Sequence, residues 1–247
     1  MDSRLALPIN TVLDGSYRIE RVVGSGGFGM TYEAEDVNLG TQVAIKEYYP
    51  FDFADRDTTM SVHPRSERHN KTFQWGRSNF LQEARTLAKF EHPSIVRVTR
   101  VFEANSTAYM VMRFEEGRTF DDWLKQLDRA PTQEELDAVV RPLLEALQMT
   151  HRADFLHRDI SPDNIIVRAD GSPVLLDFGA ARRAVAENSQ SLTGIVKPGY
   201  SPHENALGGT LCRAVTGQPP EEATLRVDED RMPPAIQAAN GKFRREF

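Results

Sequence analysis

The amino-acid sequence predicts an α+β fold in which a small antiparallel sheet with one helix precedes a mainly helical part. Residues 17–45 consist of short β-branched runs separated by glycines, which is typical of neighbouring antiparallel strands. Residues 78–90 and 132–151 carry apolar side chains at helical spacing. The length of 247 residues fits one domain of two lobes or two separate domains equally well.

The strands of the sheet are expected within YRIERVV, TYEAEDV and TQVAIK, and then within IVRVTRVF and TAYMVMRF on either side of an Asn-Ser turn. Between these groups, residues 47–77 contain prolines, aromatics and mixed charges without a clear period, which indicates a partly ordered insertion. The helix over Ser78–Phe90 places Phe80 and Leu87 on its apolar side, and Glu83 falls on the same side. An acidic side chain is therefore expected to point inward.

The helical part is expected to open with a long helix from Thr132 to about His151. Thr132 and Glu135 have the spacing of a capping box. One face of this helix carries Leu136, Val140, Leu143, Leu144 and Leu147. Pro142 is expected to bend the helix locally. Short loops and strand pairs follow, and helical sequence returns only after Asn205.

Composition narrows the classes of function. Hydrophobic residues at 40% and charged residues at 27% are those of an ordinary soluble globular protein. A formal net charge of -6 gives no overall attraction to nucleic acid, so no nucleic-acid partner is expected. The single cysteine, Cys212, excludes an internal disulfide, and the N-terminus lacks the pattern of a signal peptide. No apolar run approaches the roughly 20 residues that span a bilayer, so a cytoplasmic protein without a membrane segment is expected.

Gly24, Gly26 and Gly29 form the pattern G-x-G-x-x-G. Because glycine has no side chain, backbone N–H groups in such a loop can approach phosphate oxygens closely. A glycine-rich hairpin turn that binds no ligand is equally compatible with this pattern. The glycines lie between two expected strands and do not open a helix, which argues against a Rossmann dinucleotide site and favours a flap over a nucleotide.

Lys46 ends the apolar run Val43-Ala44-Ile45. A lysine at such a place needs either solvent or a partner of opposite charge. The simplest interpretation is a surface lysine. However, Glu83 supplies an inward-facing carboxylate, and two buried opposite charges are tolerable together and costly apart. A pair of Lys46 and Glu83 would hold the ammonium at the α- and β-phosphates of a nucleotide.

Two further motifs are His157-Arg158-Asp159-Ile160-Ser161-Pro162-Asp163-Asn164 and Asp177-Phe178-Gly179. With the glycine pattern, Lys46 and Glu83 they stand in the order and approximate spacing of the protein kinase family, which the chain resembles from Tyr17 to Glu204. Three segments are similar in sequence to bacterial Ser/Thr kinases, namely GGFGMTY, AIKEYYP and SPDNIIVRADGSPVLLDFGAAR. The resemblance implies a bilobal fold with an N-terminal extension (1–16), an N-lobe (17–115) and a mainly α C-lobe (116–247).

The resemblance also implies an activity, the transfer of the γ-phosphoryl group of ATP to Ser or Thr of protein substrates, and a role for each motif. Asp159 would accept or orient the proton of the substrate hydroxyl, and Asn164 and Asp177 would bind Mg²⁺, with Mn²⁺ as an alternative. Met112 resembles the gatekeeper, with Arg113 and Glu115 presenting hinge backbone groups to adenine. The expected nucleotide-binding residues are Val23, Gly24, Ser25, Gly26, Gly27, Phe28, Gly29, Thr31, Ala44, Lys46, Met112, Arg113 and Glu115.

Two positions near the catalytic loop differ from the family in the charge of their side chains. The family usually has Lys two residues after the catalytic Asp, and this chain has Ser161. Counting back from Glu204, Lys197 stands where the family usually has Thr, so we hypothesise that Lys197 supplies the missing cation. Arg158 beside Asp159 resembles kinases that are controlled by phosphorylation of the activation loop. Self-phosphorylation is therefore expected within residues 180–197, which include Thr193.

The C-lobe is expected to be incomplete after residue 204. A stretch that relatives carry between GYSPHEN and ALGGTLCRAVTGQPP has no counterpart, and its loss would leave apolar helix faces uncovered. An alternative function therefore stands beside the active kinase, namely a pseudokinase that binds nucleotide or a partner without turnover. A small-molecule kinase is a third option, which the Ser161 position supports.

Overall fold

The computed structural model describes residues 5–157, 159–178 and 206–217, and the chain divides into two compact units. Of the described residues, the sheet unit contains 5–91 and 96–114. The helical unit contains 92–95, 115–178 without residue 158, and 206–217. Within the described part of the chain, no helix is long and apolar enough to cross a membrane.

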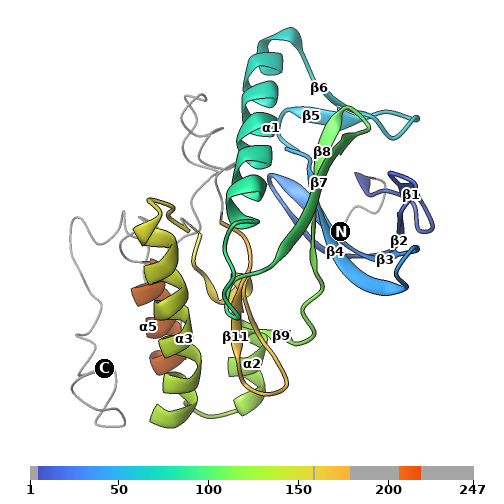
Figure 1. Cartoon of the computed structure of the whole chain (residues 1–247). Coiled ribbons are helices and arrows are strands. Elements are labelled where there is room, and N and C mark those ends of the chain that lie inside the picture. The colour runs from blue at the N-terminus through green and yellow to red at the C-terminus, as the bar shows by residue number, and fades with distance from the viewer. Residues whose placement is uncertain (1–4, 158, 179–205, 218–247) are drawn as a thin grey trace. The chain divides into compact units, whose positions relative to one another are not determined.

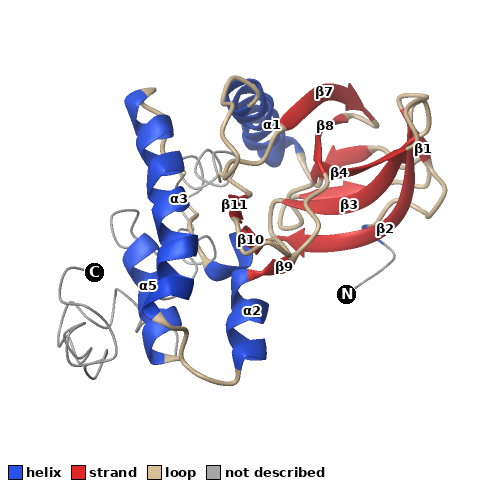
Figure 2. Ribbon diagram, turned by 60° about the horizontal axis from the view of Figure 1, so that its bottom comes forward, coloured by secondary structure: helices blue, strands red, loops and turns tan. Residues whose placement is uncertain are grey.

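The sheet unit is built on a six-stranded antiparallel sheet (Figures 1 and 2). Its strands in spatial order are β1 (Val12–Leu13), β2 (Tyr17–Gly26), β3 (Gly29–Asp36), β4 (Thr41–Tyr48), β8 (Thr107–Arg113) and β7 (Val98–Ala104). The turn between β7 and β8 consists of Asn105 and Ser106, with φ of 51° and 58°. Two positive φ angles match the twist of a tight hairpin. The strands predicted from β-branched runs are thus confirmed.

The N-terminal segment packs against one face of this sheet. Leu7 and Leu13 are buried among Tyr32, Ile45 and Val111, which belong to the main hydrophobic cluster of the unit. The Leu7 N–H donates to the Tyr32 hydroxyl at 3.1 Å. Residues 5–16, expected as an extension, therefore contribute apolar side chains to the core.

The helix expected over Ser78–Phe90 is longer than predicted. Helix α1 runs from Glu67 to Leu87, so it begins eleven residues before the expected start. Strands β5 (Ala54–Arg56) and β6 (Val62–Pro64) form a hairpin ahead of it. Phe73 in the first half of α1 is buried against the ring of Tyr48 at 5.4 Å between centroids. The segment 47–77 thus contains a β-hairpin and half of α1.

The helical unit contains α2 (Phe120–Leu127), α3 (Gln133–Arg152), the 3₁₀ turn η2 (Pro162–Asn164) and α5 (Ala206–Thr216). Its small sheet has the order β11 (Pro173–Leu175), β10 (Ile165–Val167) and β9 (Arg118–Thr119). The capping box at the start of α3 is confirmed, and the helix continues through Pro142. The predicted apolar face is wrong at one residue, because Leu144 is 49% exposed. Helices α3 and α5 lie side by side (Figures 1 and 2).

A short piece of chain between α1 and β7 belongs to the helical unit. Residues His92–Ile95 lie in sequence between two stretches of the sheet unit. Ile95 forms a parallel bridge with Leu175, and the Leu175 N–H donates to the Ser94 carbonyl at 2.9 Å. The small sheet around β11 therefore includes a contribution from a segment about eighty residues earlier in the chain.

Candidate functional site

Four of the expected nucleotide-binding residues of the sheet unit share one face of the sheet. Along β4, Val43, Ile45 and Glu47 are buried, whereas Ala44 and Lys46 are partly accessible on the opposite face. Lys46 lies directly across from Thr31 on β3, and Ala44 directly across from Met112 on β8. Since cross-strand partners share a face, the structure brings four predicted residues together there.

The glycine pattern forms the end of the β2–β3 hairpin. Gly24 pairs with Thr31 and Gly26 with Gly29, which leaves Gly27 and Phe28 as the turn. A Cβ atom added to Gly29 would lie 2.1 Å from the carbonyl oxygen of Glu47, so only glycine fits at this position. A Cβ atom on Gly26 or Gly27 would meet nothing within 4 Å. Gly29 is thus required for packing, while Gly26 and Gly27 leave open space beside the backbone.

Glu83 points inward from α1, as predicted. Its side chain is buried, in a helix whose other buried residues are apolar or glycine. Lys46 and Glu83 belong to the same unit. The pairing of these two charges remains the prediction of the sequence.

The catalytic-loop motif is held by hydrogen bonds within the helical unit. Asp159 is buried, and its N–H donates to Nδ1 of His157 at 3.3 Å. The Asn164 side-chain nitrogen donates to the main-chain oxygen and to Oδ2 of Asp159, both at 2.8 Å. His157 and Asn164 thus hold the backbone of Asp159, and Asn164 also holds its carboxylate.

The hairpin of β10 and β11 places Asn164 next to Asp177. Asn164 precedes β10, Asp177 follows β11, and the Leu176 N–H donates to the Asn164 carbonyl at 2.9 Å. Because both bonds to Asp159 use Nδ2 of Asn164, the amide oxygen is the atom that can face a cation. An amide oxygen and a carboxylate are donors that Mg²⁺ accepts, so these residues fit the expected metal.

The residues at the end of β8 have contacts that restrict their roles. Met112 is buried, and the N–H of Arg113 donates to the Arg97 carbonyl at 2.9 Å. In the helical unit, the Glu115 carboxylate accepts from Nε of Arg168 at 2.8 Å. The N–H of Arg113 and the side chain of Glu115 are thus engaged within the protein. The roles of Arg113 and Glu115 at an adenine stay predictions from the sequence.

Comparison with known proteins agrees with this geometry. The family described as protein kinase domain matches residues 17–210. The chain belongs to the protein kinase family. The solved apo form of PpkA-294 is 36% identical with a TM-score of 0.88, over 98% of this chain and 90% of that one. The α+β kinase fold predicted from the sequence is therefore confirmed.

Curated relatives of this kinase domain are bacterial. The serine/threonine-protein kinase PknA of Nostoc is 33% identical over 234 residues, which is 85% of this chain and 39% of the relative. The serine/threonine-protein kinase pkn2 of Myxococcus xanthus is 34% identical over 212 residues, covering 83% of this chain and 23% of the relative. The chain thus spans well under half the length of both proteins.

Three structural residues of the kinase domain carry no signal that sequence reasoning recognised. Arg168 donates to Glu115 and also to the Pro93 carbonyl, at 3.2 Å. A Cβ atom on Gly117 would lie 2.4 Å from the carbonyl oxygen of Val167. The ring of Phe178 packs on that of His157, with 4.2 Å between centroids. The glycine and arginine lie in ordinary loop sequence, and only the motif positions of His157 and Phe178 could have pointed to their contact.

Several predicted residues lie outside the described part of the kinase domain. These are Arg158, Gly179, the expected self-phosphorylation segment 180–197 with Lys197, and Glu204. The hypothesis on Lys197 therefore stays a prediction from the sequence. Ser161, at the position where the family usually has Lys, is fully buried, and its carbonyl accepts from the Asn164 N–H at 2.9 Å.

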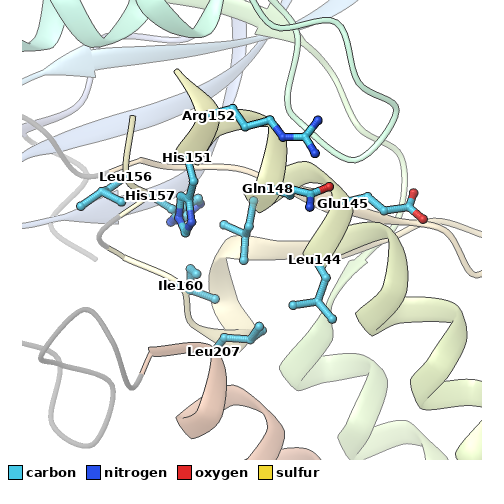
Figure 3. Close-up of a pocket in the computed structure, with 10 residues that line it drawn as sticks. Leu144, Glu145, Gln148, His151, Arg152, Leu156, His157, Ile160 and Leu207 are labelled. Atoms are coloured by element: carbon cyan, nitrogen blue, oxygen red, sulfur yellow. The ribbon is translucent and has the colours of Figure 1, made fainter. Parts of the chain in front are cut away.

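The helical unit contains a pocket whose lining, among the described residues, includes none of the expected nucleotide-binding residues. It is lined by Leu144, Leu147 and His151 of α3, by Ile160 of the catalytic loop and by Leu207 of α5, among others (Figure 3). The exposed Leu144 therefore borders an accessible apolar hollow between α3 and α5.

Proposed function

We propose that this chain is an ATP-dependent protein kinase that transfers the γ-phosphoryl group of ATP to Ser or Thr residues of protein substrates. The observation that carries the proposal is the arrangement around Asn164, whose side-chain nitrogen donates to Asp159 and whose carbonyl accepts from the N–H of Leu176, the residue before Asp177. Intact motifs in the sheet unit and relatives named as serine/threonine-protein kinases support it.

The residues have separate tasks in the proposed reaction. Asp159 accepts or orients the proton of the attacking hydroxyl, and Lys46, paired with Glu83, contacts the α- and β-phosphates. Asn164 and Asp177 hold Mg²⁺ or Mn²⁺, which neutralises the charge of the phosphate groups when it is bound. Lys197 adds a cation near the γ-phosphate, and residues 180–197 are a substrate for self-phosphorylation. The proposed location is the cytoplasm.

A transfer assay with radiolabelled ATP, Mg²⁺ and a generic protein substrate tests the proposal. The wild-type protein is compared with the Asp159→Asn variant, which lacks the proposed proton acceptor. Asp128→Asn is a matched control, because Asp128 is exposed at the end of α2 with φ of 50°, a conformation that asparagine tolerates. Incorporation lost in Asp159→Asn alone supports the proposal. Thermal stabilisation by ATP without any transfer would indicate a pseudokinase instead.

A further inference from the structure

Backbone hydrogen bonds attach the turn of the glycine-rich loop to the segment that follows β4. The Tyr49 N–H donates to the Phe28 carbonyl at 3.1 Å, and the Phe51 N–H donates to the Gly27 carbonyl at 3.2 Å. These bonds continue the ladder in which Gly29 pairs with Tyr48. The turn that would cover the phosphates is therefore paired with residues 49–51.

This attachment sets the direction of a backbone donor in the turn. The peptide group is planar and trans, so the N–H of each peptide points away from its carbonyl. With the carbonyl of Gly27 directed at Phe51, the N–H of Phe28 in the same peptide points to the other side. Such N–H groups are the donors with which a glycine-rich loop binds phosphate.

Arg56 holds the segment that carries these bonds. Its guanidinium lies over the ring of Tyr49, with 4.9 Å from Cζ to the ring centroid. Nη2 of Arg56 contacts Oε2 of Glu47 at 2.6 Å, and their side chains are 3% and 0% exposed. The other nitrogens donate at 2.9 Å to the carbonyls of Leu5 and Met60. All three nitrogens of the guanidinium are thus bonded.

Glu47 is itself fixed by two phenols. It accepts from the hydroxyls of Tyr32 at 2.8 Å and Tyr109 at 2.7 Å. Burial, followed by the Glu47 carboxylate, raises the pKa of both tyrosines, so they remain protonated donors. Burial acts to lower the pKa of Arg56, but the Glu47 carboxylate raises it above its ordinary value, so the guanidinium stays charged.

A buried ion pair is weak evidence of a gain in stability, because desolvation offsets the attraction between the charges. Its directional bonds specify geometry instead. Here the geometry is that of residues 48–51, and through them of the glycine-rich loop. We propose that Glu47 and Arg56 are positioning residues that hold this loop in the orientation that binds the phosphate groups of ATP. This inference rests on the proposed function, since it requires that the loop binds a nucleotide.

The test compares ATP with adenosine, which lacks the phosphates, by measuring the Kd of each. The variant is Glu47→Gln with Arg56→Met. The double change leaves no unpaired buried charge, and Gln keeps hydrogen bonds to both phenols. We expect the Kd for ATP to rise by about tenfold, as for other groups that orient ligand-binding residues, and the Kd for adenosine to stay unchanged. Amide exchange at Tyr49 and Phe51 should accelerate at the same time.

Arg65→Met is the matched control, because Arg65 pairs with Asp55 at 3.0 Å in the same segment but both side chains are exposed. Its ratio of the two Kd values should equal that of the wild type. An unchanged ratio of the two Kd values in the double variant would overturn the inference. An equal loss of affinity for both ligands would also overturn it, because that result indicates general destabilisation. Absence of ATP binding by the wild-type protein would instead refute the proposed function, and the inference with it.

Discussion

Asn164 donates from its side-chain nitrogen to two oxygens of Asp159, the main-chain oxygen and Oδ2, each at 2.8 Å. Replacing Asn164 by Asp removes the donor and sets a carboxylate against a carboxylate. We expect the rate of phosphoryl transfer to fall by about 100-fold, as for other lost orienting contacts. Steady-state assays measure this, with Asn38→Asp in an exposed turn as the control. A rate within twofold of wild type would show that the bond does not orient Asp159.

Two glycines of the loop, Gly27 and Gly29, should respond differently to alanine. Gly29→Ala places a Cβ atom 2.1 Å from the Glu47 carbonyl, so strands β3 and β4 must separate. We expect a loss of about 1–3 kcal/mol in the free energy of unfolding, as for other overpacked sites. Gly27→Ala meets nothing within 4 Å and should change this free energy little. Urea unfolding of both variants provides the comparison, and equal stabilities would contradict the packing at Gly29.

Two adjacent leucines of α3 offer a matched test of which face is covered. Leu143 is 1% exposed and Leu144 is 49% exposed. Leu143→Ala should lower the free energy of unfolding by about 2–5 kcal/mol because it leaves a cavity. Leu144→Ala should change it by less than about 0.5 kcal/mol, as for other surface substitutions. Similar losses in both variants would mean that Leu144 is covered in solution.

The stability contributed by Glu135 should depend on pH. A hydrogen bond from Arg129, followed by the Thr132 N–H, lowers the pKa of Glu135 from 4.5 to about 2. Because the folded pKa is depressed, the contribution is complete above pH 4.5 and is lost as the pH falls toward 2. The stability difference between wild type and Glu135→Gln should therefore shrink over this range.

Carboxyl titration by NMR gives the pKa of Glu135 directly. In Arg129→Met it should move back toward 4.5. Glu134→Gln alters an exposed neighbour in the first turn of α3 and serves as the control for helix charge. If the pKa of Glu135 in the wild-type protein were not lowered, that result would contradict the capping geometry.

Local signals predicted the parts of the fold that depend on neighbours in sequence. The capping box needed only Thr132 and Glu135, and the strands needed only β-branched alternation. The inward orientation of Glu83 followed from its spacing to Phe80 and Leu87. These features were confirmed because backbone geometry fixes them within a few residues.

The features that sequence reasoning missed depend on contacts between distant segments. The first half of α1 is polar, and its burial comes from Phe73 packing on Tyr48, which no periodicity reveals. The bond between Glu47 and Arg56 follows no motif. Leu144 fits an apolar pattern, but whether it is covered depends on which elements pack against α3. Such outcomes are set by tertiary structure and not by local propensity.

The segment His92–Ile95 has a consequence for the order of folding during synthesis. It leaves the ribosome before most of the helical unit, yet its partner Leu175 follows about eighty residues later. At 5–20 residues per second, this interval lasts several seconds. The sheet unit must therefore tolerate an unsatisfied loop between α1 and β7 until β11 emerges. The helical unit is thus completed with a piece of chain that is made before the rest of its described residues.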